Sequence, residues 1–361
     1  MTWPHRSYII RPKKSSGSGI RPDPATAKLQ DMKNQIQRFI TSRPGFESAM
    51  VEELGRMPGG ASKETWSCDV RLGDEILPLV LRINRDFPLP IALDLEPEFI
   101  LMKAAHAQGI PVPRPYWFGR LDGGAPFYAI ARIEGETIVR KLHREPVYKT
   151  ARQVMPAQLG RALAGIHRVP LAGDLDRHLP ARTENGSAAL GELAFIEKIL
   201  RNYSPDPHPA LELAFRWLRQ NVPAPGGRTL IHGDYRLGNV IFSDQGLVSI
   251  LDWELSHIGD PFEDLGYISI QAWRFGRDEL PIGGIGQRKD FLQAYQEAGG
   301  SLPDPEALRW WEVFGNVKWA VITVLQMVPF LDGSSRSIEL ASLGRKTAEV
   351  ELQILTLIEK D

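Results

Sequence analysis

The chain has 361 residues, 43% of them hydrophobic and 24% charged, which excludes wholesale disorder and allows two compact lobes. Its 43 basic and 44 acidic residues leave a formal charge of −1, so neither nucleic acid nor an anionic membrane is an expected partner. The single cysteine, Cys68, excludes a disulfide-framed secreted domain.

Residues 1–26 are rich in serine, glycine and proline and lack apolar periodicity, which predicts a flexible N-terminal tail. Their apolar run at 8–10 is too short for the core of a secretion signal. The longest apolar stretch of the chain, 319–331, is shorter than the roughly 20 residues that a membrane span needs. We therefore expect a cytoplasmic protein without a membrane span.

Residues 27–132 show the periodicities of a small sheet with two helices. One helix is expected at 28–40, and a second at 96–108 with Asp94 as its cap residue. Five segments have the alternation and turn boundaries of strands: 49–57, 64–72, 79–84, 116–119 and 127–133. The order strand, strand, strand, helix, strand, strand predicts an antiparallel-sheet N-terminal lobe.

Residues 133–361 are mainly helical in pattern. Helices are expected at 157–167, 190–201, 210–220, 261–273, 287–298, 305–328 and 345–359. Two short apolar strands interrupt them, at 240–242 and 248–251. The sequence therefore predicts an α+β fold, with a small antiparallel-sheet lobe followed by a larger, mainly helical lobe.

Three polar residues stand beside the two short strands of the second half. Asp234 begins a tight loop, Asn239 lies where that loop enters the first strand, and Asp252 follows the second strand. If the strands pair as a hairpin, Asn239 and Asp252 meet at one end and offer the hard oxygen ligands that Mg²⁺ prefers. Asp234 is then a nearby carboxylate that can orient or deprotonate a hydroxyl group.

The loop resembles the catalytic loop of protein kinases, in which Asn follows the catalytic Asp by five residues, but Gly233 stands in place of Arg. His-Gly-Asp at 232–234 and Asp-Trp-Glu at 252–254, with Gly-Asp-Pro and Asp-Leu within 259–265, resemble the aminoglycoside phosphotransferase and choline kinase superfamily. The resemblance covers roughly residues 40–350. It implies a protein-kinase-like fold that uses ATP and Mg²⁺, with residues 27–132 as the nucleotide-binding lobe and 133–361 as the catalytic and acceptor-binding lobe.

The resemblance also assigns roles within the second lobe. It implies that Asp234 is the catalytic base and that Asn239 and Asp252 hold the metal. His232 is expected to brace the loop rather than transfer protons, and Asp260 and Asp264 are likewise interpreted as structural. For His257 two positions stay open, an exposed one or one in the wall of the acceptor pocket.

A glycine turn at 58–65 stands between the first two strands of the small lobe. Backbone N–H groups of such a turn can lie over phosphates, so Gly59, Gly60 and Ser62 are candidate nucleotide contacts. The turn resembles the family's Gly-Gly-x-Ser-Asn-x-Thr form, except that Lys63 replaces Asn.

Arg82, on the third strand, occupies the place where the family usually has a lysine that binds phosphates. We expect Glu98 of the following helix to be its partner. Arginine stays charged and can donate two hydrogen bonds to a phosphate or carboxylate, but it is longer and planar. The alternative is that Arg82 is a surface arginine with a mobile ion pair. Lys63 is then the lysine near enough in sequence to bind the phosphates instead.

The environment of Arg82, Leu-Val-Leu-Arg-Ile-Asn, resembles the branch of the family found alone in bacteria or fused to acyl-CoA dehydrogenases. The segment 127–133 corresponds by position to the edge that binds adenine in the kinase plan. There the backbone of Ile130, Ala131 and Arg132 is expected to hydrogen-bond the base.

The sequence thus predicts a kinase that transfers the γ-phosphate of ATP to a hydroxyl group of a small molecule. A hydroxyacyl thioester and an aminoglycoside-like compound are both candidate acceptors. The alternative is a pseudokinase that binds nucleotide and regulates, with Arg82 as its main support. A protein kinase is disfavoured because Trp253 follows Asp252 where Asp-Phe-Gly would be expected. The acceptor, the choice of ATP or GTP and the oligomeric state stay open.

Overall fold

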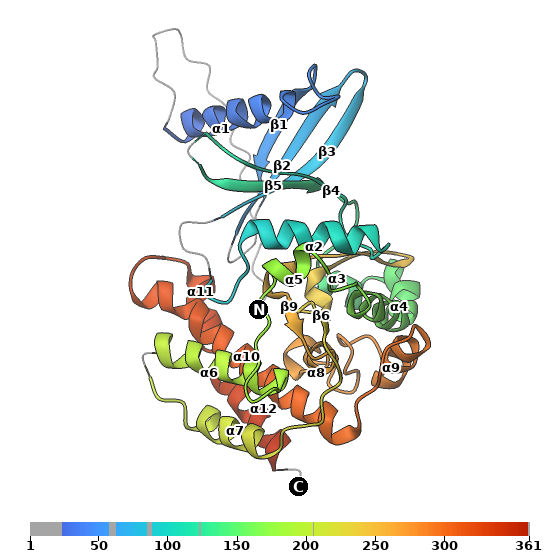
Figure 1. Cartoon of the computed structure of the whole chain (residues 1–361), viewed down its shortest axis with the longest axis vertical. Helices are drawn as coiled ribbons and strands as arrows, with labels where there is room; N and C mark the ends of the chain where they lie inside the picture. Colours follow the sequence, from blue (N-terminus) through green and yellow to red (C-terminus); the bar gives the residue numbers. More distant parts are fainter. Residues whose placement is uncertain (1–23, 58–62, 85–88, 123, 205, 360–361) are drawn as a thin grey trace.

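The structure, a computed structural model, describes residues 24–57, 63–84, 89–122, 124–204 and 206–359. It has a small lobe built on one sheet and a larger lobe built mainly of helices (Figure 1), so the predicted α+β architecture is confirmed. Of the predicted tail, residues 1–23 lie outside the described residues. Residues 24–26, also assigned to the tail, instead begin the first helix, α1 (Pro24–Thr41).

The small lobe contains a five-stranded antiparallel sheet in the order β1-β2-β3-β5-β4. Its strands are β1 (Met50–Arg56), β2 (Lys63–Leu72), β3 (Glu75–Asn84), β4 (Pro115–Arg120) and β5 (Pro126–Ala131). Each predicted strand is present, and the last one ends at residue 131 rather than 133. Consecutive strands β1, β2 and β3 pair as neighbours, as short connections favour.

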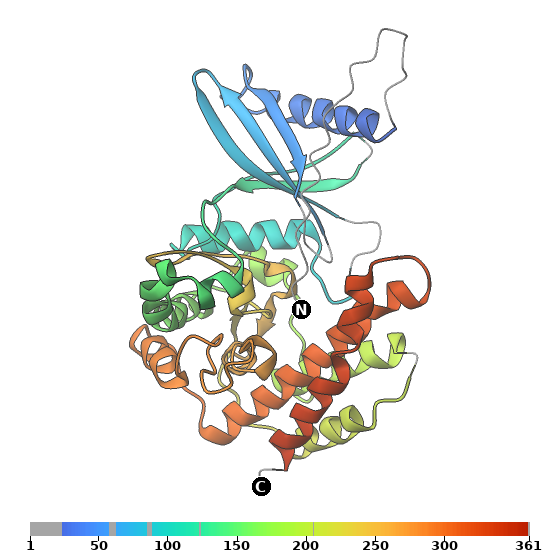
Figure 2. The same ribbon diagram turned by 180° about the vertical axis from the view of Figure 1, so that it is seen from behind.

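Two helices cover opposite faces of this sheet. Successive side chains of a strand point to opposite sides, so Phe127 packs in the cluster on the α1 side while Tyr128 packs on the α2 side. Helix α2 (Leu95–Ala107) lies between the sheet and the large lobe in both views (Figures 1 and 2). Asp94 precedes it as predicted, but its side chain makes no capping hydrogen bond.

The large lobe is assembled from helices of very different lengths. The longer ones are α4 (Lys149–His167), α6 (Ala188–Tyr203), α7 (Pro209–Gln220), α9 (Arg288–Glu297), α10 (Pro305–Leu331) and α12 (Thr347–Ile358). The short ones are α3 (Val139–Arg144), α5 (Asp174–His178), α8 (Phe262–Tyr267) and α11 (Ile338–Gly344). Single 3-10 turns occur at Pro146–Tyr148, Leu237–Asn239, Trp253–Leu255 and Gln271–Trp273.

Two helix predictions need correction. The helix expected at 157–167 starts at Lys149 and contains Pro156, which removes one main-chain hydrogen bond without ending the helix. The helix expected at 261–273 ends at Tyr267 and is followed by the 3-10 turn at 271–273. Helices α3, α5 and α11 were not predicted; they have five to seven residues, too few for a clear apolar period.

Helix α10 forms the centre of the large lobe. Trp310, Trp311 and Phe314 of this helix are fully buried and belong to the core. Within the described part of the chain, α10 is the one helix long and apolar enough to cross a membrane, and 67% of its most apolar window is buried inside the protein. A buried core helix passes the same test, so its length and composition are weak evidence for a span.

Two pairs of short strands position the loop that carries the polar residues. Strands β7 (Val240–Ser243) and β8 (Gly246–Ile250) form the predicted antiparallel hairpin. Strands β6 (Thr229–Ile231) and β9 (His257–Gly259), which were not predicted, pair antiparallel across the 25 residues between them. The loop between β6 and β7 is therefore fixed at both of its ends.

Candidate active site

Asp234, Asn239 and Asp252 converge at the end of the β7–β8 hairpin. The Leu251 amide donates to the Asn239 carbonyl over 2.8 Å, which places Asp252 next to Asn239. The Asn239 side-chain amide donates to Asp234 Oδ2 over 2.6 Å and to the Asp234 carbonyl over 3.0 Å. Because the side-chain nitrogen of Asn239 makes these two hydrogen bonds, its side-chain oxygen remains available as a hard ligand beside the Asp252 carboxylate.

Arg236 fixes the other oxygen of the Asp234 carboxylate. Its Nε donates to Asp234 Oδ1 over 2.9 Å, and its guanidinium lies 4.6 Å from the centre of the Trp273 ring. Arg236 was not among the predicted site residues, although its position two residues after Asp234 in the loop is a signal that could have found it. Asp234 is therefore held in one orientation by two side chains.

Asp264 braces the loop by binding main-chain amides of the loop. Its carboxylate accepts hydrogen bonds from the His232 amide over 2.8 Å and the Gly233 amide over 2.9 Å. Gly233 has φ of +80°, and a Cβ at this position would lie 2.2 Å from the Leu255 carbonyl oxygen. The arginine that protein kinases have here would not fit this backbone.

His232 and Asp260 also have the contacts of bracing residues. The His232 ring is buried, and its Nε2 lies 3.0 Å from the Leu251 carbonyl oxygen. Burial lowers the pKa of His232, which keeps the imidazole neutral despite the nearby Asp264. Asp260 accepts from the amides of Gly226 and Phe262 over 2.7 and 2.9 Å, which ties the chain before β6 to the start of α8.

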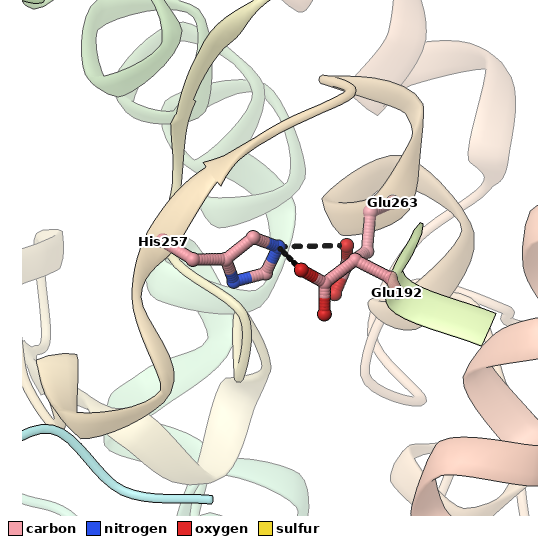
Figure 3. A group of neighbouring side chains, drawn as sticks. All are labelled: Glu192, His257 and Glu263. Carbon is pink, nitrogen blue, oxygen red and sulfur yellow. Dashed lines mark hydrogen bonds and ion pairs between the residues drawn. The ribbon is translucent and has the colours of Figure 1, made fainter. Parts of the chain in front are cut away.

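Behind the loop lies a group that we name the sealed cluster, formed by Glu192, His257, Glu263 and Lys318. His257 Nε2 is 3.0 Å from Glu263 Oε2 and 3.6 Å from Glu192 Oε1, and the imidazole points at both carboxylates (Figure 3). Lys318 donates to Glu263 over 2.8 Å and to the Gly233 carbonyl over 2.6 Å. All four residues are buried, so an exposed His257 is wrong, and His257 is also absent from the described lining of the larger cavity beside the loop.

Charge in the sealed cluster is balanced by ion pairs. Burial disfavours the protonated form of His257, but the two carboxylates outweigh it and raise the pKa to about 9. The ligand atoms of Glu192, His257 and Glu263 lie within 4.8 Å of one another, close enough for a metal ion. Glu192 already accepts from Arg182 over 2.8 Å, and Glu263 from Lys318, so these cations meet the charge that a metal would neutralise.

A second group, which we name the nucleotide cluster, lies between the lobes: Lys63, Arg82, Glu98, Asp252 and Glu254. The predicted pairing of Arg82 with Glu98 is wrong. Lys63 donates to Glu98 Oε2, and Arg82 donates to Asp252 Oδ1 over 3.0 Å. Lys63 can reach Glu98 because it begins β2 opposite Asn84, at the end of the sheet nearest α2.

The carboxylates of the nucleotide cluster differ in their ionisation. Burial would raise the pKa of Asp252, but the charges of Arg82 and Arg236 outweigh it and lower that pKa. Burial, with the charge of Asp252, raises the pKa of Glu254 to about 7. Arg82 is 15% exposed by its side chain, so the alternative of a mobile surface arginine is also wrong.

A cavity of about 320 Å³ lies between the sheet and the large lobe. It is lined by apolar residues of both lobes and by the predicted edge of the sheet: Val80, Met102, Tyr128, Ile130, Ala131, Arg132, Ile241, Leu251 and Trp253. Arg82, Glu98 and Asp252 lie at its polar end. We name it the nucleotide cavity, and its size suits a flat heterocyclic base.

The nucleotide contacts predicted around this cavity come from the glycine turn and from the edge of the sheet. Gly59, Gly60 and Ser62 lie outside the described residues. The Ala131 amide donates to the Arg114 carbonyl over 2.8 Å and the Arg132 amide to the Pro78 carbonyl over 2.9 Å. These two N–H groups are therefore used within the small lobe, and the hydrogen bonds expected between a base and the backbone of Ile130, Ala131 and Arg132 stay a prediction.

A larger cavity, of about 680 Å³, begins at the loop between β6 and β7. Asp234, Arg236, Asn239 and Asp252 line its inner end, and Asp252 is shared with the nucleotide cavity. Its outer wall comes from α10, α11, α12 and the link between the last two: Asn316, Trp319, Ile322, Gln326, Glu339, Leu343, Lys346, Glu349, Val350 and Gln353. We name it the acceptor cavity.

Comparison with known proteins places this geometry in a family. The sequence pattern of the phosphotransferase enzyme family matches residues 54–311. Acyl-CoA dehydrogenase family member 10 of Mus musculus is 30% identical over 237 residues, which are 64% of this chain and 21% of that protein. The chain therefore spans only about a fifth of that curated relative.

Solved structures share the fold at low sequence identity. A crystal structure from Ralstonia eutropha has a TM-score of 0.68 at 21% identity, covering 92% of this chain and 98% of that one. Spectinomycin phosphotransferase in complex with ADP and spectinomycin has a TM-score of 0.60 at 13% identity, covering 89% and 98%. The kinase-like fold is thus confirmed, and the chain belongs to the phosphotransferase enzyme family.

Proposed function

We propose that the protein transfers the γ-phosphate of ATP to a hydroxyl group of a small molecule. The observation that carries this proposal is the position of Asp252, which lies at the meeting point of the nucleotide cavity and the acceptor cavity. A phosphate bound beside Asp252 faces Asp234 and the acceptor cavity at once. Phosphoryl transfer depends mainly on such positioning and on neutralised charge.

The residues present fit a magnesium ion. Asn239 and Asp252 would hold it through oxygen atoms, and Asp252 stays ionised because Arg82 and Arg236 lower its pKa. A bound Mg²⁺ would neutralise charge on the transferred phosphate. Arg82, which lines the nucleotide cavity, would pair with the remaining phosphate oxygens.

Asp234 would act on the acceptor. Arg236 and Asn239 hold its carboxylate at the inner end of the acceptor cavity. There it can accept the proton of the attacking hydroxyl while the oxygen of that hydroxyl forms a bond to the γ-phosphorus. The bond from that phosphorus to the β,γ-bridging oxygen breaks, and ADP leaves.

The acceptor cavity has a mixed lining. Trp273, Trp319 and Ile322 give it apolar surface, whereas Glu254 and Asp278 give it acidic groups. Trp273 Nε1 and Gln326 Oε1 are buried without a hydrogen-bond partner among the described residues, so polar groups of an acceptor could bind them. Such a lining supports an acceptor with both apolar and polar parts, and it selects neither acyl thioesters nor amino sugars.

The test is a transfer assay with Mg²⁺ and γ-labelled ATP against a panel of hydroxylated amino sugars, macrolides and hydroxyacyl thioesters. Asp234→Asn should lower transfer at least about 100-fold while nucleotide binding persists. Asp244→Asn, an exposed aspartate in the β7–β8 turn, is the matched control and should stay active. Undiminished transfer by Asp234→Asn would refute the assignment of the base. Nucleotide binding without transfer to any acceptor would favour the pseudokinase.

A further inference from the structure

The nucleotide cluster contains two cations, and only one of them borders the nucleotide cavity. Arg82 lines the cavity, together with Glu98 and Asp252. Lys63 is absent from the described lining of both the nucleotide and the acceptor cavity, and its side chain is 1% exposed. Two cations so close together therefore have different surroundings, although each contacts carboxylates of the same cluster.

Glu98 is fully occupied without Arg82. One oxygen accepts from Lys63, and the other accepts from the Tyr128 hydroxyl over 2.9 Å. Glu98 is itself 1% exposed, so its charge needs a cation inside the protein. In this structure Lys63 is that cation.

Arg82 is the next cation available to Glu98. It pairs in register with Tyr128, whose hydroxyl contacts Glu98, so the guanidinium starts one strand away from that carboxylate. Arg82 and Glu98 also border the same cavity. Without Lys63, the attraction of Glu98 would compete directly with that of Asp252.

We propose that Lys63 is a positioning residue of the nucleotide site, which neutralises Glu98 and thereby leaves Arg82 for Asp252 and the nucleotide phosphates. This inference rests on the proposed function, because it assumes that phosphates bind beside Arg82. The usual pairing of one strand cation with one helix glutamate is thus divided between two strands. β2 supplies the partner of the glutamate, and β3 supplies the cation that faces the cavity.

Charge rescue tests this division of tasks. Mg-ATP affinity is measured by calorimetry on the full chain for wild type, Lys63→Met, Lys63→Met/Glu98→Gln and the control Arg71→Met. Arg71 is an exposed cation on the same strand, paired with Glu52. Lys63→Met should weaken binding about tenfold or more, since Arg82 turns toward Glu98. The double variant should return to within about threefold of wild type, because the competing charge is gone.

A crystal structure of Lys63→Met gives a readout independent of binding, with Arg82 expected on Glu98 instead of Asp252. Wild-type affinity in Lys63→Met would overturn the proposal. A double variant as weak as Lys63→Met would also overturn it, because Lys63 would then hold phosphates directly. If Lys63→Met does not fold, the double variant alone decides, with near-wild-type affinity in support and weak binding against. Failure of wild type to bind Mg-ATP would instead refute the proposed function.

Discussion

The sealed cluster and the nucleotide cluster both combine carboxylates with basic side chains, yet their environments differ. In the sealed cluster Glu263 and Glu192 each meet a cation, and every member is buried. In the nucleotide cluster the Asp252 side chain remains 37% exposed beside two cavities, and Glu254 has its pKa raised to about 7. One group has its charges balanced by the protein, and the other has a carboxylate directed toward open space.

This difference distinguishes a cluster that stabilises the fold from a cluster that can bind a ligand. A buried ion-pair network with complete partners holds elements together, here α6, β9, α8 and α10 around the catalytic loop. A cluster that borders a cavity keeps polar groups available for a ligand. Substitutions in the sealed cluster should therefore change mainly stability, and substitutions in the nucleotide cluster mainly activity.

The largest effect should come from Lys318→Met. This change leaves Glu263 and the Gly233 carbonyl without their buried ammonium partner, and should lower the free energy of unfolding by about 3–5 kcal/mol. Urea denaturation measures it, with Lys198→Met on the exposed face of α6 as control. A loss below about 1 kcal/mol would mean that the sealed cluster does not support the fold as described.

His257 should make stability fall at alkaline pH. Its pKa is about 9 in the folded protein against an ordinary 6.5, so the stabilisation is complete below pH 6.5 and is lost as the pH rises through 9. The loss should be on the order of 3 kcal/mol. Urea denaturation between pH 7 and 9.5 tests this, and the titration of Glu254, whose pKa is about 7, falls at the lower end of that range. His257→Asn should abolish the slope, and an unchanged slope in this variant would contradict the assignment.

Asp252→Asn should lower turnover about 100-fold, equivalent to about 2.7 kcal/mol, because even residues behind a metal ligand cost 10–100-fold. The unfolding free energy should change far less than in Lys318→Met. Asp252 has φ of +62°, a conformation that asparagine also tolerates, so the variant is not strained. If this variant is as unstable as Lys318→Met, the distinction between the two clusters fails.

The smallest effect should come from the exposed ion pair of Arg38 and Asp122, whose side chains are 59% and 62% exposed. Arg38→Gln should change the unfolding free energy by less than about 1 kcal/mol, since water already solvates both charges. Thermal unfolding measures it. A larger loss would show that burial does not explain why this ion pair and the buried Lys318–Glu263 pair differ in their contribution to stability.

Much of the fold was predictable because its signals are local. The alternation in β2 and the glycine turn before it predicted neighbouring strands, as β1 and β2 are. Strands β7 and β8 are neighbours in the chain, so Asn239 and Asp252 could be brought together from sequence. The helical period of residues 305–328 likewise predicted α10.

What failed depends on contacts between distant segments. His257 is buried because β9 pairs with β6, and three-residue strands carry no detectable alternation. The partner of Glu98 depends on the reach of the Lys63 side chain from another strand, and Lys318 meets Gly233 across 85 residues. Propensity and spacing contain no information on such pairings.

The helices after residue 311 have a consequence for how this protein can diverge. The family pattern ends at 311, whereas the outer wall of the acceptor cavity is formed by residues 316–353. Under the proposed function, changes in this C-terminal portion would alter acceptor preference while Asp234, Asn239 and Asp252 stay constant. Chimeras exchanged at the start of α10 would test this, because they would replace the outer wall of the cavity and keep its inner end.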